Sequence, residues 1–284
     1  MVPFPPVVED DHEEAFLTEN PRFKTDMHGN DVPWMTGITS EEGAMKSAPL
    51  IYNSELTTDL LKNWIRALPI SLYYHHHAPE KQEEFTRKID DFYFKNQKLT
   101  LTTQQNLTNL YTDGWFFHAM IDYLKLRFTN EQRAETFVYL FTHKGACSFT
   151  EIFKGGSEAF YGTSHAEELQ YLFPIRQDLP YFFNSIPTEE DKRVTQIITK
   201  LWVNFAYFGY CKHWNRHQSL LMANCLFISE IRRLNPRTPI YWSGLQPAVS
   251  LWNSCKSEMK MDVQKNYSRW KVIYTRSVRP FGTT

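Results

Sequence analysis

Two short apolar runs stand out in the pattern of hydrophobic and polar positions along the chain. Residues 31–38 lie between a Gly-Asn pair and a Ser-Glu-Glu-Gly segment, and residues 136–141 form a continuous aromatic and β-branched run. Apolar runs of this length bounded by turn residues are typical of buried strands, and unbroken ones are typical of parallel sheets covered on both faces. The pattern therefore predicts two buried strands.

Helical spacing of apolar residues dominates the chain between and after these strands. Residues 80–94 place four large apolar side chains on one helical face, and residues 100–128 continue with similar spacing. A further helix is predicted from residue 188, where Thr-Glu-Glu-Asp has the form of a capping box. The order strand, helical excursion, strand and helix predicts an α/β fold.

Composition indicates a folded protein without a charge bias. Lys and Arg number 31 against 32 Asp and Glu, and no basic stripe with interleaved aromatic residues follows the sequence, so nucleic acid is not an expected partner. A chain of 284 residues can bury about 75% of its unfolded surface. We treat it as one domain, or as part of one.

Localisation signals are not evident in these residues. No apolar run reaches the roughly 18 residues that a transmembrane helix needs, and residues 2–14 lack the apolar core of a signal peptide. Two sequons, at Asn106 and Asn266, are candidate N-glycosylation sites if the protein enters the secretory pathway. The residues alone leave the compartment open.

No pattern points to a metal or a cofactor. The four cysteines form no CxxC pair and no paired His/Cys spacing, so neither zinc nor a redox dithiol is indicated. Residues 75–77 are three consecutive histidines, which cannot all face one ion on a regular helix, and we interpret them as a solvated loop. We expect no bound cofactor.

Two residues are candidates for acid–base chemistry. Glu42 follows the strand predicted at residues 31–38, and open α/β sheets place their reactive residues beyond the carboxyl ends of strands. A role in favouring the N-terminus of a following helix is the alternative. His165 lies in a Gly-Thr-Ser-His segment, where an imidazole can act as a general base, although a structural role is the alternative.

A nucleophile is missing from the motifs of the chain. No Gly-x-Ser-x-Gly segment occurs, and that segment builds the tight turn that exposes the serine of an esterase. No His-Gly-Gly run for an oxyanion hole occurs either.

Collinear segments across most of the chain carry a family resemblance. They are VPFPPVVE at 2–9, VPWMTGITSEEGA at 32–44, YGTSHAEE at 161–168, YLFP at 171–174, WVNFA at 202–206 and RWKVIY at 269–274. With these segments the chain resembles the second half of the type-B carboxylesterases, most closely those of insects.

The resemblance implies a fold, a reaction and two site residues. The fold is the C-terminal half of an α/β-hydrolase fold, with an incomplete, mostly parallel sheet and many helices over residues 1–284. The reaction is hydrolysis of a small apolar carboxylic ester through an acyl-enzyme, with Glu42 as the triad acid and His165 as the base. The order of acid and base agrees with the Ser, Asp/Glu, His order of these enzymes.

The same resemblance places the serine upstream of Met1, outside these residues. We therefore expect the 284 residues by themselves to be inactive. The alternatives are a non-catalytic esterase-like binding or adhesion module, and a gene-model fragment. The family also implies an extracellular location.

Residues 210–234 depart from the family pattern. The family runs from Asn-Phe-Ala through a glycine directly into Asn-Pro-x-Pro, whereas here Gly209 is separated from the Asn-Pro that begins at Asn235. We interpret residues 210–234 as an inserted segment or as an imperfect gene model.

Overall fold

The computed structural model describes residues 7–19, 31–95, 97–128, 134–153, 162–175 and 186–209, and the backbone of residues 228–233. In chain order the elements are β1 (Trp34–Thr39), α1 (Ala44–Tyr52), α2 (Ser54–Lys62), α3 (Trp64–Ser71), α4 (Pro79–Ile89), η1 (Asp90–Phe94), η2 (Leu101–Thr103), α5 (Gln104–Tyr111), η3 (Thr112–Phe117), α6 (His118–Phe128), β2 (Thr136–Phe141), α7 (Thr150–Phe153), α8 (Leu169–Leu172), α10 (Glu189–Phe208) and β3 (Ile228–Arg233).

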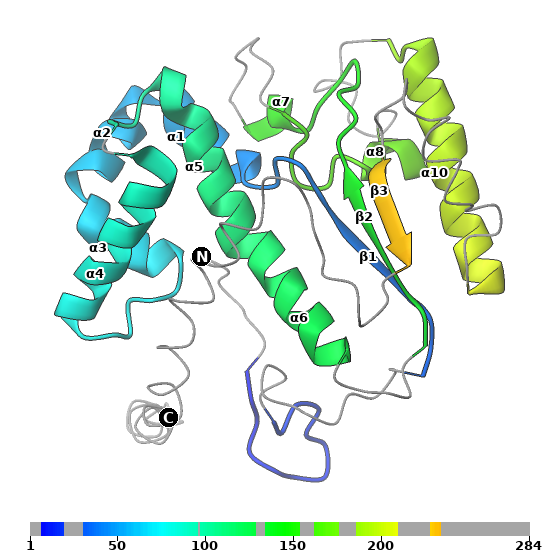
Figure 1. The fold of residues 1–284 in the computed structure, drawn as a ribbon, viewed down its shortest axis with the longest axis horizontal. Coiled ribbons are helices and arrows are strands. Elements are labelled where there is room, and N and C mark those ends of the chain that lie inside the picture. The colour runs from blue at the N-terminus through cyan, green and yellow to red at the C-terminus, as the bar shows by residue number, and fades with distance from the viewer. Residues whose placement is uncertain are drawn as a thin grey trace, which may run out of the picture.

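The three strands form one sheet in the order β1-β2-β3 (Figure 1). Strands β1 and β2 are the two predicted strands, and they pair in parallel with Trp34 opposite Thr136 and Thr39 opposite Phe141. Because both strands end level with each other, the segments that follow them emerge at the same edge of the sheet. Strand β3 pairs antiparallel with β2 and lies within residues 210–234, where no strand was predicted.

Helices pack on both faces of β2, as expected for a buried strand, whereas residues 34–37 of β1 are only partly buried. Successive side chains of a strand point to opposite faces. Accordingly, Phe137 and Phe141 of β2 pack with Val194 and Ile198 of α10. Val138 faces the other way and packs in a second cluster with residues of η3 and α6. Figure 1 shows α6 and α10 on either side of the strands.

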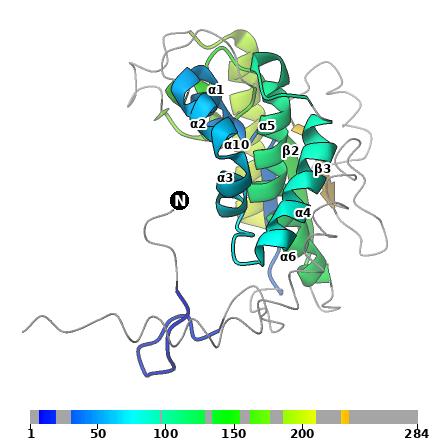
Figure 2. The same ribbon diagram turned by 90° about the vertical axis from the view of Figure 1, so that its left-hand side faces the viewer.

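The helical excursion between β1 and β2 has a core of its own. Helices α1 to α5 enclose a cluster that includes Leu68, Phe85, Ile89, Leu107 and Leu110, all nearly or fully buried. Figure 2 shows these helices grouped in front of the sheet, with α10 behind it. The cluster explains the predicted helical periodicity, because each helix turns one apolar face toward it.

Two π-helical turns interrupt helices that the pattern predicted as continuous. Turn η1 follows α4, and η3 lies between α5 and α6. An extra residue per turn rotates the face that the helix presents. At η3 the apolar face of the helix turns from one core to another. Leu110 of α5, before the turn, packs in the helical cluster, whereas Leu124 of α6, after it, packs against the sheet.

Helix α10 begins where the sequence predicts. Thr188 accepts a hydrogen bond from the amide of Asp191, whose side chain accepts one in return from the amide of Thr188, so the capping box is confirmed. Gly209 ends the helix in the left-handed conformation that glycine adopts without strain. None of the helices in the described part of the chain is both long and apolar enough to cross a bilayer.

Candidate functional site

Glu42 lies in the tight turn between β1 and α1 and is only 4% exposed. The amide of Thr39 donates to its Oε1 at 2.8 Å. The next residue, Gly43, donates its amide to the hydroxyl of Thr112 at 2.9 Å, and a Cβ there would lie 2.2 Å from the carbonyl oxygen of Thr108. Only glycine allows the turn to approach α5 this closely, and the approach holds Glu42 in place.

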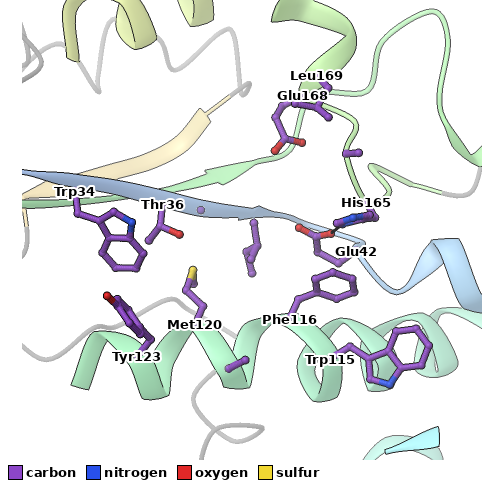
Figure 3. A pocket seen from close by; sticks show the side chains of 14 residues that line it. Trp34, Thr36, Glu42, Trp115, Phe116, Met120, Tyr123, His165, Glu168 and Leu169 are labelled. Atoms are coloured by element: carbon purple, nitrogen blue, oxygen red, sulfur yellow. Dashed lines mark hydrogen bonds and ion pairs between the residues drawn. The ribbon is translucent and has the colours of Figure 1, made fainter. Parts of the chain in front are cut away.

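His165 lies in the loop that precedes α8, and the structure brings it to Glu42. Its Nδ1 is 2.6 Å from Oε2 of Glu42 across a separation of 123 residues. The two carboxylate oxygens of Glu42 are thus directed to the Thr39 amide and to the imidazole, which argues against the alternative role at the helix N-terminus. Figure 3 shows the pair side by side at one end of a cavity.

Burial and partners give the two members of this pair different properties. The side chain of His165 is 44% exposed, whereas that of Glu42 is almost fully buried. The hydrogen bond to Glu42 raises the pKa of His165 above its usual value, although partial burial opposes this. The ring of Phe116 lies 4.8 Å from that of His165 and covers one side of it. One imidazole nitrogen is therefore held by a carboxylate while the ring stays open to solvent.

The cavity beside the pair has a volume of about 450 Å³. Most of its lining is apolar: Trp34, Gly37, Ile38, Trp115, Phe116, Ala119, Met120, Tyr123, Ala166 and Leu169, together with Thr36, Glu42, His165 and Glu168 (Figure 3). It lies along β1, which is an edge strand of the described sheet. Burial raises the pKa of Glu168, which accepts a hydrogen bond from the hydroxyl of Tyr139 at 3.2 Å.

A buried carboxylate that sequence reasoning missed anchors the loop of His165. Glu167 is 1% exposed, and its Oε2 accepts hydrogen bonds from the hydroxyls of Ser148 and Ser164, both at 3.0 Å, and from the amide of Phe149 at 3.1 Å. Gln170 donates to its Oε1 at 2.7 Å. The sequence does not distinguish Glu167 from Glu168, because both are glutamates in the same loop. Which of the two side chains points into the protein interior depends on how the loop packs.

A second histidine–carboxylate pair joins the end of β2 to α10, and sequence reasoning missed it too. His143 Nε2 lies 2.7 Å from Oδ1 of Asp191, and both side chains are 3% exposed. Burial lowers the pKa of His143. Burial also opposes ionisation of Asp191, but hydrogen bonds from Thr188 and His143 outweigh it and hold its pKa at about 2. Since solvent does not reach this pair, we assign it a structural role.

Other candidate residues lie away from the cavity. The interpretation of residues 75–77 as solvated was wrong for His77, which is 5% exposed and packs edge-on against Phe85. Within the described residues, no group of three His, Cys, Asp or Glu side chains is arranged to hold a metal ion. Asn106 is partly exposed on α5, and its glycosylation stays a prediction. Asn266 lies outside the described residues.

Comparisons with known proteins agree with the resemblance. Residues 1–269 match the model of a family described as the carboxylesterase family. A carboxylic ester hydrolase of Bombus ignitus is 26% identical over 211 residues, covering 73% of this chain and 36% of that protein. A juvenile hormone esterase of Tribolium castaneum is 25% identical over 185 residues, covering 63% of this chain and 31% of that protein. The chain thus spans about a third of the length of these relatives.

The fold is also similar to a solved structure. The crystal structure of juvenile hormone esterase from Manduca sexta, with OTFP covalently attached, matches with a TM-score of 0.62 at 19% identity. The match covers 89% of this chain and 47% of that one. The likeness confirms the α/β-hydrolase fold expected from the sequence.

Proposed function

The chain belongs to the carboxylesterase family, and we propose that Glu42 and His165 are the acid and the base of a catalytic triad that hydrolyses carboxylic esters. The observation that carries this proposal is the contact of 2.6 Å between His165 Nδ1 and Glu42 Oε2. A buried carboxylate that holds one nitrogen of a half-exposed imidazole is the arrangement that a triad requires.

The geometry supports separate roles for the two residues. With Nδ1–H donating to Glu42, the Nε2 of His165 carries a lone pair, so it can take the proton of a serine hydroxyl and later return it to the leaving alcohol. Glu42 keeps the imidazole in this tautomer and stabilises the imidazolium that forms in each transition state.

We propose that the nucleophilic serine comes from residues outside these 284. The sequence holds no Gly-x-Ser-x-Gly segment, and loss of a triad nucleophile leaves only the modest catalysis of the binding groups. On this proposal residues 1–284 are one part of a larger hydrolase domain, and residues 210–234 are an insertion in it. An extracellular location is expected if the rest of the protein follows the family pattern.

The cavity supports an apolar ester as the substrate class. Tryptophan, phenylalanine, tyrosine and methionine side chains line the part that extends from His165 along β1 and α6 (Figure 3). Such a lining excludes water and binds apolar acyl or alcohol groups through burial of their surface. The name of one relative, juvenile hormone esterase, agrees with an ester substrate.

Covalent labelling with a fluorophosphonate tests this proposal, because the reagent traps an activated serine. We expect no label on the 284-residue chain. A protein extended by the coding sequence upstream of Met1 should be labelled if that sequence holds a Gly-x-Ser-x-Gly segment. Glu42→Ala and His165→Ala should each slow labelling of the extended protein by about 10⁴-fold.

Matched exposed residues serve as controls. Glu13→Ala and His12→Ala change side chains of the same types that lie in the solvated N-terminal segment, and labelling should stay at the parent rate. Labelling of the 284-residue chain, or undiminished labelling of the His165→Ala protein, would contradict the assignment. An upstream sequence without the serine would favour the binding-module alternative.

A further inference from the structure

Glu41 joins the turn that carries Glu42 to the loop that carries His165. The amide of Glu41 donates to the carbonyl oxygen of Thr163 at 3.0 Å. The amide of Thr163 donates in return to Oε2 of the Glu41 side chain at 2.8 Å. This reciprocal pair connects residues 122 positions apart in the chain.

The side chain of Glu41 also determines which residue can stand at position 162. Gly162 has a φ of +102°, and a Cβ there would lie 2.7 Å from Cγ and 2.9 Å from Cδ of Glu41. Glycine is therefore required both by the backbone conformation and by the close approach of Glu41. The hydroxyl of Ser40 donates to the same Oε2 of Glu41, which holds the carboxylate in this position.

The contact lies next to both members of the proposed triad. Glu41 precedes Glu42 directly, and Thr163 stands two residues before His165. Without the Glu41 carboxylate the amide of Thr163 would lose its acceptor. Because Thr163 is fully buried, solvent could not replace that acceptor, and an unsatisfied buried donor is costly. The loop would then relax by moving Thr163, and His165 would move with it.

We propose that Glu41 is a positioning residue, whose side-chain oxygen clamps the loop of His165 against the turn of Glu42 and so maintains the contact between imidazole and carboxylate. The catalytic consequence rests on the function proposed above, but the clamp itself does not.

Histidine NMR titration of the 284-residue chain tests the clamp, with the His165 signal assigned by its absence in His165→Ala. Glu41→Gln keeps an oxygen acceptor and removes the charge, whereas Glu41→Asp keeps the charge and shortens the reach of the oxygen. If the acceptor matters, Glu41→Asp lowers the measured His165 pKa by about 1 unit, as expected when a carboxylate partner is loosened. Glu41→Gln should titrate like the parent.

The opposite order of the two variants would overturn the proposal, because it would mean that Glu41 acts on His165 only through its charge. A parent-like titration in both variants would overturn it as well. Glu83→Asp, on the exposed face of α4, is the control and should leave the His165 titration unchanged.

The outcome is independent of the proposed esterase activity, since the titration needs no serine. If the extended protein is never labelled by a fluorophosphonate but Glu41→Asp still lowers the His165 pKa, the clamp stands and the proposed function fails. If labelling depends on Glu42 and His165 but the titrations do not respond to Glu41→Asp, the clamp fails and the function stands.

Discussion

The buried carboxylate Glu167 offers a quantitative test of how the His165 loop is held. Burial raises its pKa to about 7 from an ordinary 4.5, although hydrogen bonds from Ser148, Ser164 and Phe149 favour ionisation. Between these values the folded chain keeps a proton that the unfolded chain releases. Stability therefore falls as pH rises through this window, because ionisation favours the unfolded state.

The structure gives the size of the effect of Glu167→Gln. Relative to its stability at low pH, where Glu167 is protonated in both states, the parent has lost about 1 kcal/mol at pH 5 and about 3 kcal/mol at pH 8 because of this pKa difference. The glutamine cannot lose stability in this way. Its amide oxygen can still accept the three hydrogen bonds that Oε2 receives. Its nitrogen would face the donor nitrogen of Gln170, but the hydroxyl of the protonated acid does so as well, so the substitution adds little further cost.

We therefore expect Glu167→Gln to be more stable than the parent by about 1 kcal/mol at pH 5 and by about 3 kcal/mol at pH 8. Urea unfolding followed by tryptophan fluorescence at both pH values measures this difference, in which the other titrating groups cancel. Glu83→Gln, an exposed change on α4, should show no such dependence on pH. An equal effect of Glu167→Gln at the two pH values would refute the reasoning, because it would show that ionisation of Glu167 has no cost in the fold.

Two further predictions concern the histidine–carboxylate pairs. In an extended, active protein, kcat/KM should decline as pH falls through the raised pKa of His165, because a protonated imidazole cannot accept the serine proton. Glu42→Gln removes the carboxylate that raises this pKa, so the decline should move to lower pH. A pH–rate profile that does not move in this variant would contradict the assignment. Asp191→Ala should lower the free energy of unfolding by about 3 kcal/mol, since it breaks a buried pair and a helix cap. Glu189→Ala, an exposed change in the same helical turn, is the control and should lower the free energy of unfolding only slightly. If Asp191→Ala lowers it no more than this control does, the pair contributes little to stability.

Much of the local structure was predictable from the order of residue types. The continuous run at residues 136–141 corresponds to β2, and the Thr188 capping box begins α10 as expected. These features depend on interactions between residues that are close in the chain, so the local order of residue types is enough to predict them. The π-helical turn η3 was not predicted, because the extra residue serves the passage from one core to another and leaves no local pattern.

The candidate site was likewise predictable only in part. Glu42 was a candidate because it follows a strand, and His165 because it lies in a glycine-containing loop, but the residues alone left a structural role open for each. The collinear resemblance to carboxylesterases linked the two residues in one proposed triad. Their catalytic roles stay a prediction.

The sequence by itself determined the two parallel strands, the helical excursion and the family. Only the tertiary structure decided that Glu42 and His165 meet at 2.6 Å, that Glu41 clamps Thr163, and that Glu167 is buried while Glu168 faces the cavity. The physical reason is that propensity and periodicity act over a few residues. A contact between loops more than a hundred residues apart, and the pKa that burial produces, depend on how the strands and helices pack around both.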